Sequence, residues 1–296
     1  MKSGKKLSSV FNSSKEIELN DMSKIIIFSD VHRGDNTLSD NFAKNQEIFI
    51  KALKYYFVEN YTYIEIGDGD ELWENKYLNT IVTNHLDVFK LLSKFYEKGK
   101  LFMLFGNHDI IKRYISLNKK KKLINNHESK FNALFLDIEI YEGLILNYKN
   151  TGKKIFLIHG HQGDFLNDDI WMIARFLVRY FWRPLELIGI KNPTRVCNNK
   201  KKKLNVEKNL ISWIKKNKIL LIAGHTHKVA FPKKGEDLYF NDGCCVYPDY
   251  ITGIEICNGS ISMVKWWMKS KNDKSFIYKD IVEGPIKIKY YFESLL

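Results

Sequence analysis

The chain has 296 residues, of which 45% are hydrophobic and 27% are charged. This composition is ordinary for a soluble globular protein and excludes a disordered, fibrous or membrane-embedded chain. The 47 basic and 34 acidic residues give a net charge of +13. Such an excess favours anionic partners (phosphorylated substrates, nucleic acid or lipid headgroups), unless it reflects only a lysine-rich composition.

The cysteines and the first residues indicate a cytoplasmic location. The four cysteines, Cys197, Cys244, Cys245 and Cys257, show no Cys-x-x-Cys spacing, so we expect reduced thiols. Residues 1–23 are polar and lack the apolar segment of a signal peptide. We therefore expect a cytoplasmic protein that contacts a membrane, if at all, only peripherally from the inner face.

The first third of the chain alternates apolar runs with helical patterns. Strands are predicted at 24–28, 61–66 and 101–105, and helices at 42–59 and 78–98. This alternation predicts an α/β fold with right-handed crossovers and a largely parallel sheet.

The remainder combines further strands with one long apolar insertion. A hairpin is predicted at 144–148 and 154–158, a helix at 206–216 and a strand at 219–223, with basic loops at 119–122 and 200–203. The stretch 168–190 is strongly apolar and helical, with a break expected at Pro184. We expect a main domain over 24–268 containing a helical insertion at about 165–205, an N-terminal extension (1–23) and a peripheral C-terminal tail (269–296).

Five predicted strands each end in a polar cluster. The clusters contain Asp30 and His32, then Asp68, then Asn107 and His108, then His159 and His161, and finally His225 and His227. Ligand sites of open α/β sheets lie at the carboxyl ends of strands. This mixed oxygen and nitrogen set suits manganese, iron or zinc, and it is too large for one tetrahedral ion. Two adjacent ions can clamp a phosphoryl group during in-line displacement.

The order of these motifs resembles the calcineurin-like metallophosphoesterases. The matching residues are Asp30-x-His32, Gly67-Asp68, Gly106-Asn107-His108-Asp109, His159-Gly160 and Gly224-His225-x-His227. The resemblance implies a four-layer α/β/β/α sandwich and two divalent ions, with manganese expected first and iron or zinc as alternatives. It assigns Asp30, His32 and His227 to one ion, Asn107, His159 and His225 to the other, and Asp68 as the bridge.

The resemblance also implies roles around the ions. His108 would stabilise the transition state or protonate the leaving oxygen, and Asp109 would orient it. Asp70 is an alternative bridge to Asp68, while His161 is expected behind the ligands or facing the substrate. Arg33 is either a bidentate phosphate ligand or an ordinary surface arginine.

Two features point to the substrate. Gly67-Asp68-x-x-Glu71-x-Trp73 and Tyr239-Phe240-Asn241-Asp242-Gly243 resemble the branch that contains the UDP-2,3-diacylglucosamine pyrophosphatases of lipid A synthesis. In the insertion, Arg175, Arg179 and Arg183 recur every four residues and share one helical face. They could hold a lipid phosphate or pyrophosphate, or they could be solvated arginines on a packed helix.

These observations predict a metal-dependent hydrolase of phosphate esters or pyrophosphates, with a lipid-linked or nucleotide-sugar substrate. One alternative is a phosphodiesterase or nuclease, which the lysine runs support; no basic strand interleaved with aromatic residues is expected for base stacking. Another alternative is a non-catalytic scaffold, but such a protein should lack ligands that this sequence retains.

Overall fold

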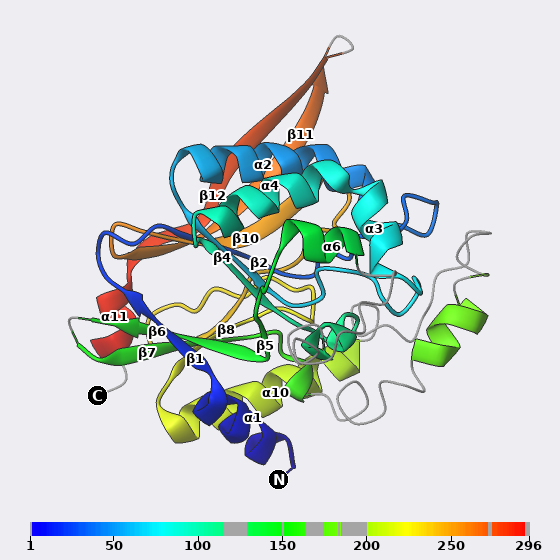
Figure 1. Ribbon diagram of the computed structural model, residues 1–296. Coiled ribbons are helices and arrows are strands. Elements are labelled where there is room, and N and C mark those ends of the chain that lie inside the picture. Colours follow the sequence, from blue (N-terminus) through cyan, green and yellow to red (C-terminus); the bar gives the residue numbers. More distant parts are fainter. Residues whose placement is uncertain are drawn as a thin grey trace.

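The computed structural model describes residues 2–114, 129–149, 151–163, 175–182, 184, 200–271 and 274–293. They form two β-sheets (Figure 1). In spatial order, the larger sheet consists of β12 (Lys274–Lys287), β11 (Ser260–Lys271), β10 (Tyr250–Cys257), β2 (Ile25–Phe28), β3 (Thr62–Ile66), β4 (Leu101–Leu104) and β5 (Ile140–Tyr141). The smaller sheet consists of β1 (Lys15–Leu19), β6 (Gly143–Tyr148), β7 (Lys153–Ile158), β8 (Leu220–Ala223) and β9 (Tyr239–Asn241).

Helices cover the outer face of each sheet. The larger sheet packs against α2 (Gln46–Val58) and α4 (Leu86–Glu97), with α3 (Leu78–Asn84) and α6 (Ser129–Leu134) beside them. The smaller sheet packs against α1 (Lys2–Ser13) and α10 (Lys200–Asn217). A third apolar cluster lies between the two sheets and includes residues of the short helix α11 (Ile288–Glu293). These layers confirm the predicted α/β/β/α sandwich (Figure 1).

The strands that precede the polar clusters lie in both sheets. Strands β2, β3 and β4 are parallel neighbours in the larger sheet, while β7 and β8 are parallel neighbours in the smaller one. All four residues of β2 are buried, because a strand covered on both faces needs apolar side chains in both directions. The carboxyl ends of these five strands lead into the loops that build the site.

Several expectations about the elements need correction. The larger sheet is mixed, since β10, β11 and β12 run antiparallel to their neighbours. Residues 1–23 supply α1 and β1, and residues 274–287 supply a sheet strand, so both ends of the chain belong to the sandwich. The expected helix 78–98 is divided at His85, whose φ of −119° separates α3 from α4.

The two basic segments have different outcomes. Residues 200–203, expected as a loop, form the first turn of α10. Residues 119–122, and most of the insertion expected at 165–205, lie outside the described residues. Its described part includes a π-helical turn, Val178–Trp182. No helix within the described ranges is long and apolar enough to span a membrane.

Candidate metal centre

The backbone is strained where the predicted ligands leave their strands. Asp30, His32, Asp68, His225 and His227 have φ values of 49°, 50°, 49°, 67° and 50°. Non-glycine residues rarely adopt this left-handed conformation, which costs of order 1 kcal/mol or more per residue. Strain concentrated on five of the seven predicted ligands indicates that the surrounding structure holds them for a function.

Asp30, His32 and His227 form the first ligand group. Nε2 of His227 lies 2.9 Å from Oδ1 of Asp30, and Nε2 of His32 lies 3.7 Å from the same oxygen. The two Nε2 atoms are 3.3 Å apart. Three potential ligand atoms thus converge on one point, as a bound cation requires.

Asp68, His159 and His225 form the second ligand group. Nε2 of His159 lies 3.1 Å from Oδ2 of Asp68 and 3.2 Å from Nδ1 of His225. Asn107 is also buried, and its Oδ1 accepts no hydrogen bond from any described residue. A buried amide oxygen without a donor is expensive, so the donor set fits a second divalent ion.

Asp68 lies between the two groups. Its Oδ2 is 3.9 Å from Nε2 of His32 in the first group and 3.1 Å from Nε2 of His159 in the second. Its other oxygen, Oδ1, accepts a 2.8 Å hydrogen bond from the backbone N–H of His108. This position is the one expected of a bridging carboxylate.

The ligands perturb one another's ionisation. Burial alone would raise the pKa of Asp30, but His227 and His159 outweigh it and hold the pKa well below its usual range. Burial alone would lower the pKa of His159, but Asp68 and Asp30 raise it to about 9. Burial lowers the pKa of His227 despite the opposing effect of Asp30. The carboxylate of Asp30 is therefore ionised and can bind a cation directly, whereas His159 must lose a proton before it can bind one.

Glu71 connects the ligands to His108. Its two carboxylate oxygens accept from Nδ1 of His32 at 2.9 Å and from Nδ1 of His108 at 2.7 Å. These three residues are close enough to hold a cation themselves, but the hydrogen bonds already use the carboxylate. Each imidazole is left with Nε2 for a metal ion or a substrate, because a carboxylate that accepts from Nδ1 fixes the proton on that nitrogen.

Asp109 was expected to orient His108, but its carboxylate bonds other groups. It accepts hydrogen bonds from the backbone N–H groups of Gly106 and Gly69, at 2.7 and 3.2 Å, and its Oδ2 pairs with Nζ of Lys112 at 2.8 Å. Asp109 therefore fastens the loops after β3 and β4 to each other, and Glu71 takes the orienting role.

Arg33 and Asp70 belong to a buried ion-pair cluster. Arg33 has no exposed surface; it makes a bidentate pair with Glu65 at 2.8 Å and donates to Asp70 at 2.7 Å. Burial alone would raise the pKa of Asp70, but Arg33 and Lys112 lower it to about 2. This geometry contradicts the expectation that Arg33 holds a substrate phosphate, and it removes Asp70 as a bridging ligand.

The remaining predicted substrate residues lie in different surroundings. His161 is fully buried, and burial together with His159 lowers its pKa. Arg179 donates to the backbone carbonyls of Leu72, Trp73 and Asn75 at 2.7, 3.1 and 3.0 Å. Arg175 is partly exposed, and Arg183 lies outside the described residues. The insertion thus touches the loop that carries Trp73, and Arg179 donates hydrogen bonds to the backbone of that loop.

Sequence reasoning overlooked two supporting groups. The ring of Trp73 stacks on His108, and the hydroxyl of Ser29 lies within hydrogen-bond distance of the carboxylates of both Asp30 and Asp242, at 2.7 Å from Asp242. Trp73 and Asp242 both lie in motifs that the resemblance had drawn attention to. The two motifs pointed to these residues, but the sequence alone could not show that Trp73 contacts His108 or that Asp242 contacts Ser29.

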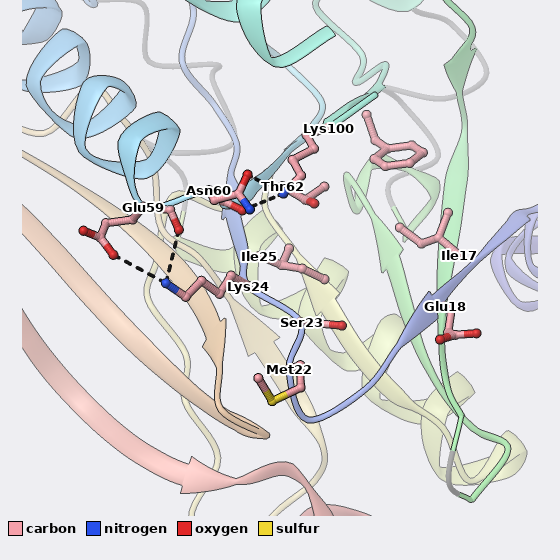
Figure 2. A pocket seen from close by; sticks show the side chains of 11 residues that line it. Ile17, Glu18, Met22, Ser23, Lys24, Ile25, Glu59, Asn60, Thr62 and Lys100 are labelled. Carbon is pink, nitrogen blue, oxygen red and sulfur yellow. Dashed lines mark hydrogen bonds and ion pairs between the residues drawn. The ribbon is translucent and has the colours of Figure 1, made fainter. Parts of the chain in front are cut away.

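A separate pocket of about 420 Å³ lies at the opposite end of the strands (Figure 2). Lys24, Thr62 and Lys100 stand there at the amino ends of β2, β3 and β4. The lysine amino groups are occupied, because Lys24 bonds Glu59 and Lys100 bonds Asn60 (Figure 2). Because the pocket lies at the amino ends of these strands and the predicted ligands lie at their carboxyl ends, the pocket is distinct from the metal centre.

One comparison with known proteins identifies the family of this chain. The sequence model of the calcineurin-like phosphoesterases matches residues 23–229, so the chain belongs to the calcineurin-like phosphoesterase family. No curated protein sequence matches the chain.

Solved structures of similar fold share little sequence. Vacuolar protein sorting 29 from Cryptosporidium parvum has 12% identity and a TM-score of 0.35, over 88% of this chain and 98% of that one. Vps29 from Chaetomium thermophilum has 8% identity and a TM-score of 0.41, over 88% and 96%. A putative 5'-nucleotidase from Staphylococcus aureus has 10% identity and a TM-score of 0.37, over 92% and 57%. Likeness at this level says nothing of this protein's activity.

Proposed function

We propose that this protein is a phosphoesterase that hydrolyses phosphate esters or pyrophosphates at two divalent metal ions. The observation that carries the proposal is the pair of ligand groups, Asp30/His32/His227 and Asp68/His159/His225, with Asp68 within 4 Å of a histidine from each group. Metal ions bound there would neutralise phosphate charge and make hydroxide available near neutral pH.

The protein's own residues supply the proton chemistry. A water oxygen forms a bond to phosphorus, the ester P–O bond breaks, and the leaving oxygen takes up a proton. His108 is the best-placed donor, because it lies beside both ligand groups without belonging to either, its side chain reaches the surface, and Glu71 holds its Nδ1 at 2.7 Å. Nε2 is then the ring nitrogen available to the leaving oxygen.

The ring of His108 is held by contacts with two side chains. Trp73 stacks on its ring, and Glu71 ties it to His32. A fixed imidazole needs little reorganisation in the transition state, which favours proton transfer.

A hydrolysis screen with manganese tests the proposal. The substrates are aryl phosphate mono- and diesters, UDP-sugars and lipid pyrophosphates; the last two classes represent the lipid-linked or nucleotide-sugar substrate that the motif resemblance supports. Hydrolysis of at least one class that stops with EDTA and returns with manganese is the expected result. No hydrolysis of any class by manganese-loaded protein would reject the proposal.

A further inference from the structure

A face of the β10–β11–β12 region carries aromatic rings and lysines in alternation. We call it the aromatic–lysine face, and its rings and lysines are Tyr247, Tyr250, Lys265, Trp267, Lys269, Phe276 and Tyr278. Asp280 lies on the same face, paired with Lys265, and its carboxylate accepts a 2.6 Å hydrogen bond from Nε1 of Trp267. Its centre is a row across three adjacent strands, because Trp267 is paired with Tyr250 on one side and with Tyr278 on the other. Directly paired residues share a sheet face, so the three rings form one surface.

The lysines lie between the rings. Nζ of Lys265 is 4.2 Å from the centroid of the Tyr250 ring, and Lys269 pairs with Phe276 one step beyond the row. Along β11, Lys265, Trp267 and Lys269 share a face because side chains alternate on a strand. The structure therefore contradicts the expectation that the chain lacks a basic strand interleaved with aromatic residues.

The face continues to the metal centre. The Tyr247 ring stacks on Tyr250 with centroids 4.6 Å apart, and its hydroxyl donates to the backbone carbonyl of His227 at 2.6 Å. Since β10 runs antiparallel to β2, Tyr250 lies at the edge of the sheet where Asp30 follows β2. The series of rings begins beside a metal ligand and extends along a hairpin that projects past α2 (Figure 1).

The outer rings are open to solvent. Phe276 is 46% exposed and Tyr278 44% exposed, and the centroid of Tyr278 lies 5.1 Å from that of Trp267. Exposed aromatic groups rimmed by polar residues mark interaction sites. Stacking platforms combined with cations are typical of surfaces that hold single-stranded nucleic acid.

We propose that the aromatic–lysine face binds single-stranded nucleic acid, with bases stacked on its rings and phosphates paired with Lys265 and Lys269. The net charge of +13 complements such a polyanion. A lipid anchor would need its rings only where the hairpin meets a bilayer, whereas Tyr247 and Tyr250 lie beside the metal centre. If single-stranded nucleic acid binds beside the metal centre, the substrate class is a phosphodiester. Its cleavage rests on the proposed function, but its binding does not.

Fluorescence anisotropy of a labelled 20-residue oligo-dT, measured in EDTA, tests the binding step. Replacing Trp267 and Tyr278 together with Ala should weaken binding by about tenfold or more, since each stacked base contributes substantially. Tyr290→Ala, which removes a ring that is 58% exposed on α11, should leave binding unchanged. Thermal unfolding of each variant verifies that it folds.

The salt dependence tests the lysines separately. Replacing Lys265 and Lys269 with Gln should reduce the slope of log K against log salt by about 1.4, at ~0.7 per lost phosphate contact on single strands. The matched control replaces Lys51 and Lys54, both exposed on α2, and should not change the slope.

Three outcomes would overturn the assignment: no oligonucleotide binding, equal losses in the control variants, or binding to vesicles of anionic phospholipid but not to the oligonucleotide. Hydrolysis of bis(p-nitrophenyl) phosphate with manganese is measured in parallel. Hydrolysis without oligonucleotide binding rejects the binding face alone. Ring-dependent binding without hydrolysis of any substrate supports the face and rejects the proposed function.

Discussion

The Trp73 ring lies parallel to the ring of His108, with centroids 4.2 Å apart and an interplanar angle of 19°. The carbonyl of Trp73 accepts a hydrogen bond from Arg179, which also bonds Leu72 and Asn75. Arg179 of the insertion therefore supports the loop that carries Trp73, and Trp73 in turn packs against His108. Arg179 affects the site through the backbone of this loop.

Replacing His108 with Ala should slow hydrolysis by about 10²–10⁴-fold, the usual contribution of a positioned acid–base group. Metal content should stay nearly unchanged, because neither ligand group requires this imidazole. Steady-state kinetics and elemental analysis of the same preparation check both parts. Unchanged turnover would remove His108 from the mechanism, and loss of metal would make it a ligand.

Replacing Arg179 with Gln should reduce kcat by roughly ten- to a hundredfold, because the loop carrying Trp73 loses its support and a small misplacement of a catalytic group is costly. KM for a small aryl phosphate should change little. If Arg179 instead held the substrate's phosphates, the variant would raise KM and leave kcat nearly intact.

Replacing Arg33 with Met should destabilise the fold by about 3–5 kcal/mol, because Glu65 and Asp70 remain buried without their cation. Urea unfolding measures the loss, with the exposed Lys51→Met as the control. A variant of normal stability and raised KM would restore Arg33 as a phosphate ligand.

Metal binding should release protons. The pKa of His159 is raised to about 9 by Asp68 and Asp30, which outweigh the effect of burial. The ring is therefore protonated at pH 7 and must lose its proton to bind a cation, so metal affinity should increase as the pH rises towards 9. Calorimetric titration with manganese in two buffers of different ionisation enthalpy detects the release, and a heat independent of the buffer would contradict it.

The sequence predicted where the ligands leave their strands, because short apolar runs such as Ile25–Phe28 indicate buried strands and the polar residues follow directly. It could not show that β7 and β8 lie in a second sheet, since strand pairing depends on contacts distant in sequence. Arg33 suggested an exposed phosphate ligand because arginines are rarely buried. Its partner Glu65 lies inside β3, and only the folded sheet brings the two together.

The hairpin at the C-terminal end was missed for a related reason. Trp267 and Lys269 alternate within β11, but Phe276 and Tyr278 join their surface only after β12 pairs with β11. The expected domain boundary at residue 268 also placed Trp267 in the main domain and Phe276 and Tyr278 in the tail.

The measurement that tests the central claim most directly is the rate of bis(p-nitrophenyl) phosphate hydrolysis during titration of the metal-free protein with manganese. Two ligand groups that share Asp68 predict that the rate rises to a plateau at about two equivalents per chain. A plateau at one equivalent, or no hydrolysis at any manganese concentration, would contradict a dinuclear phosphoesterase.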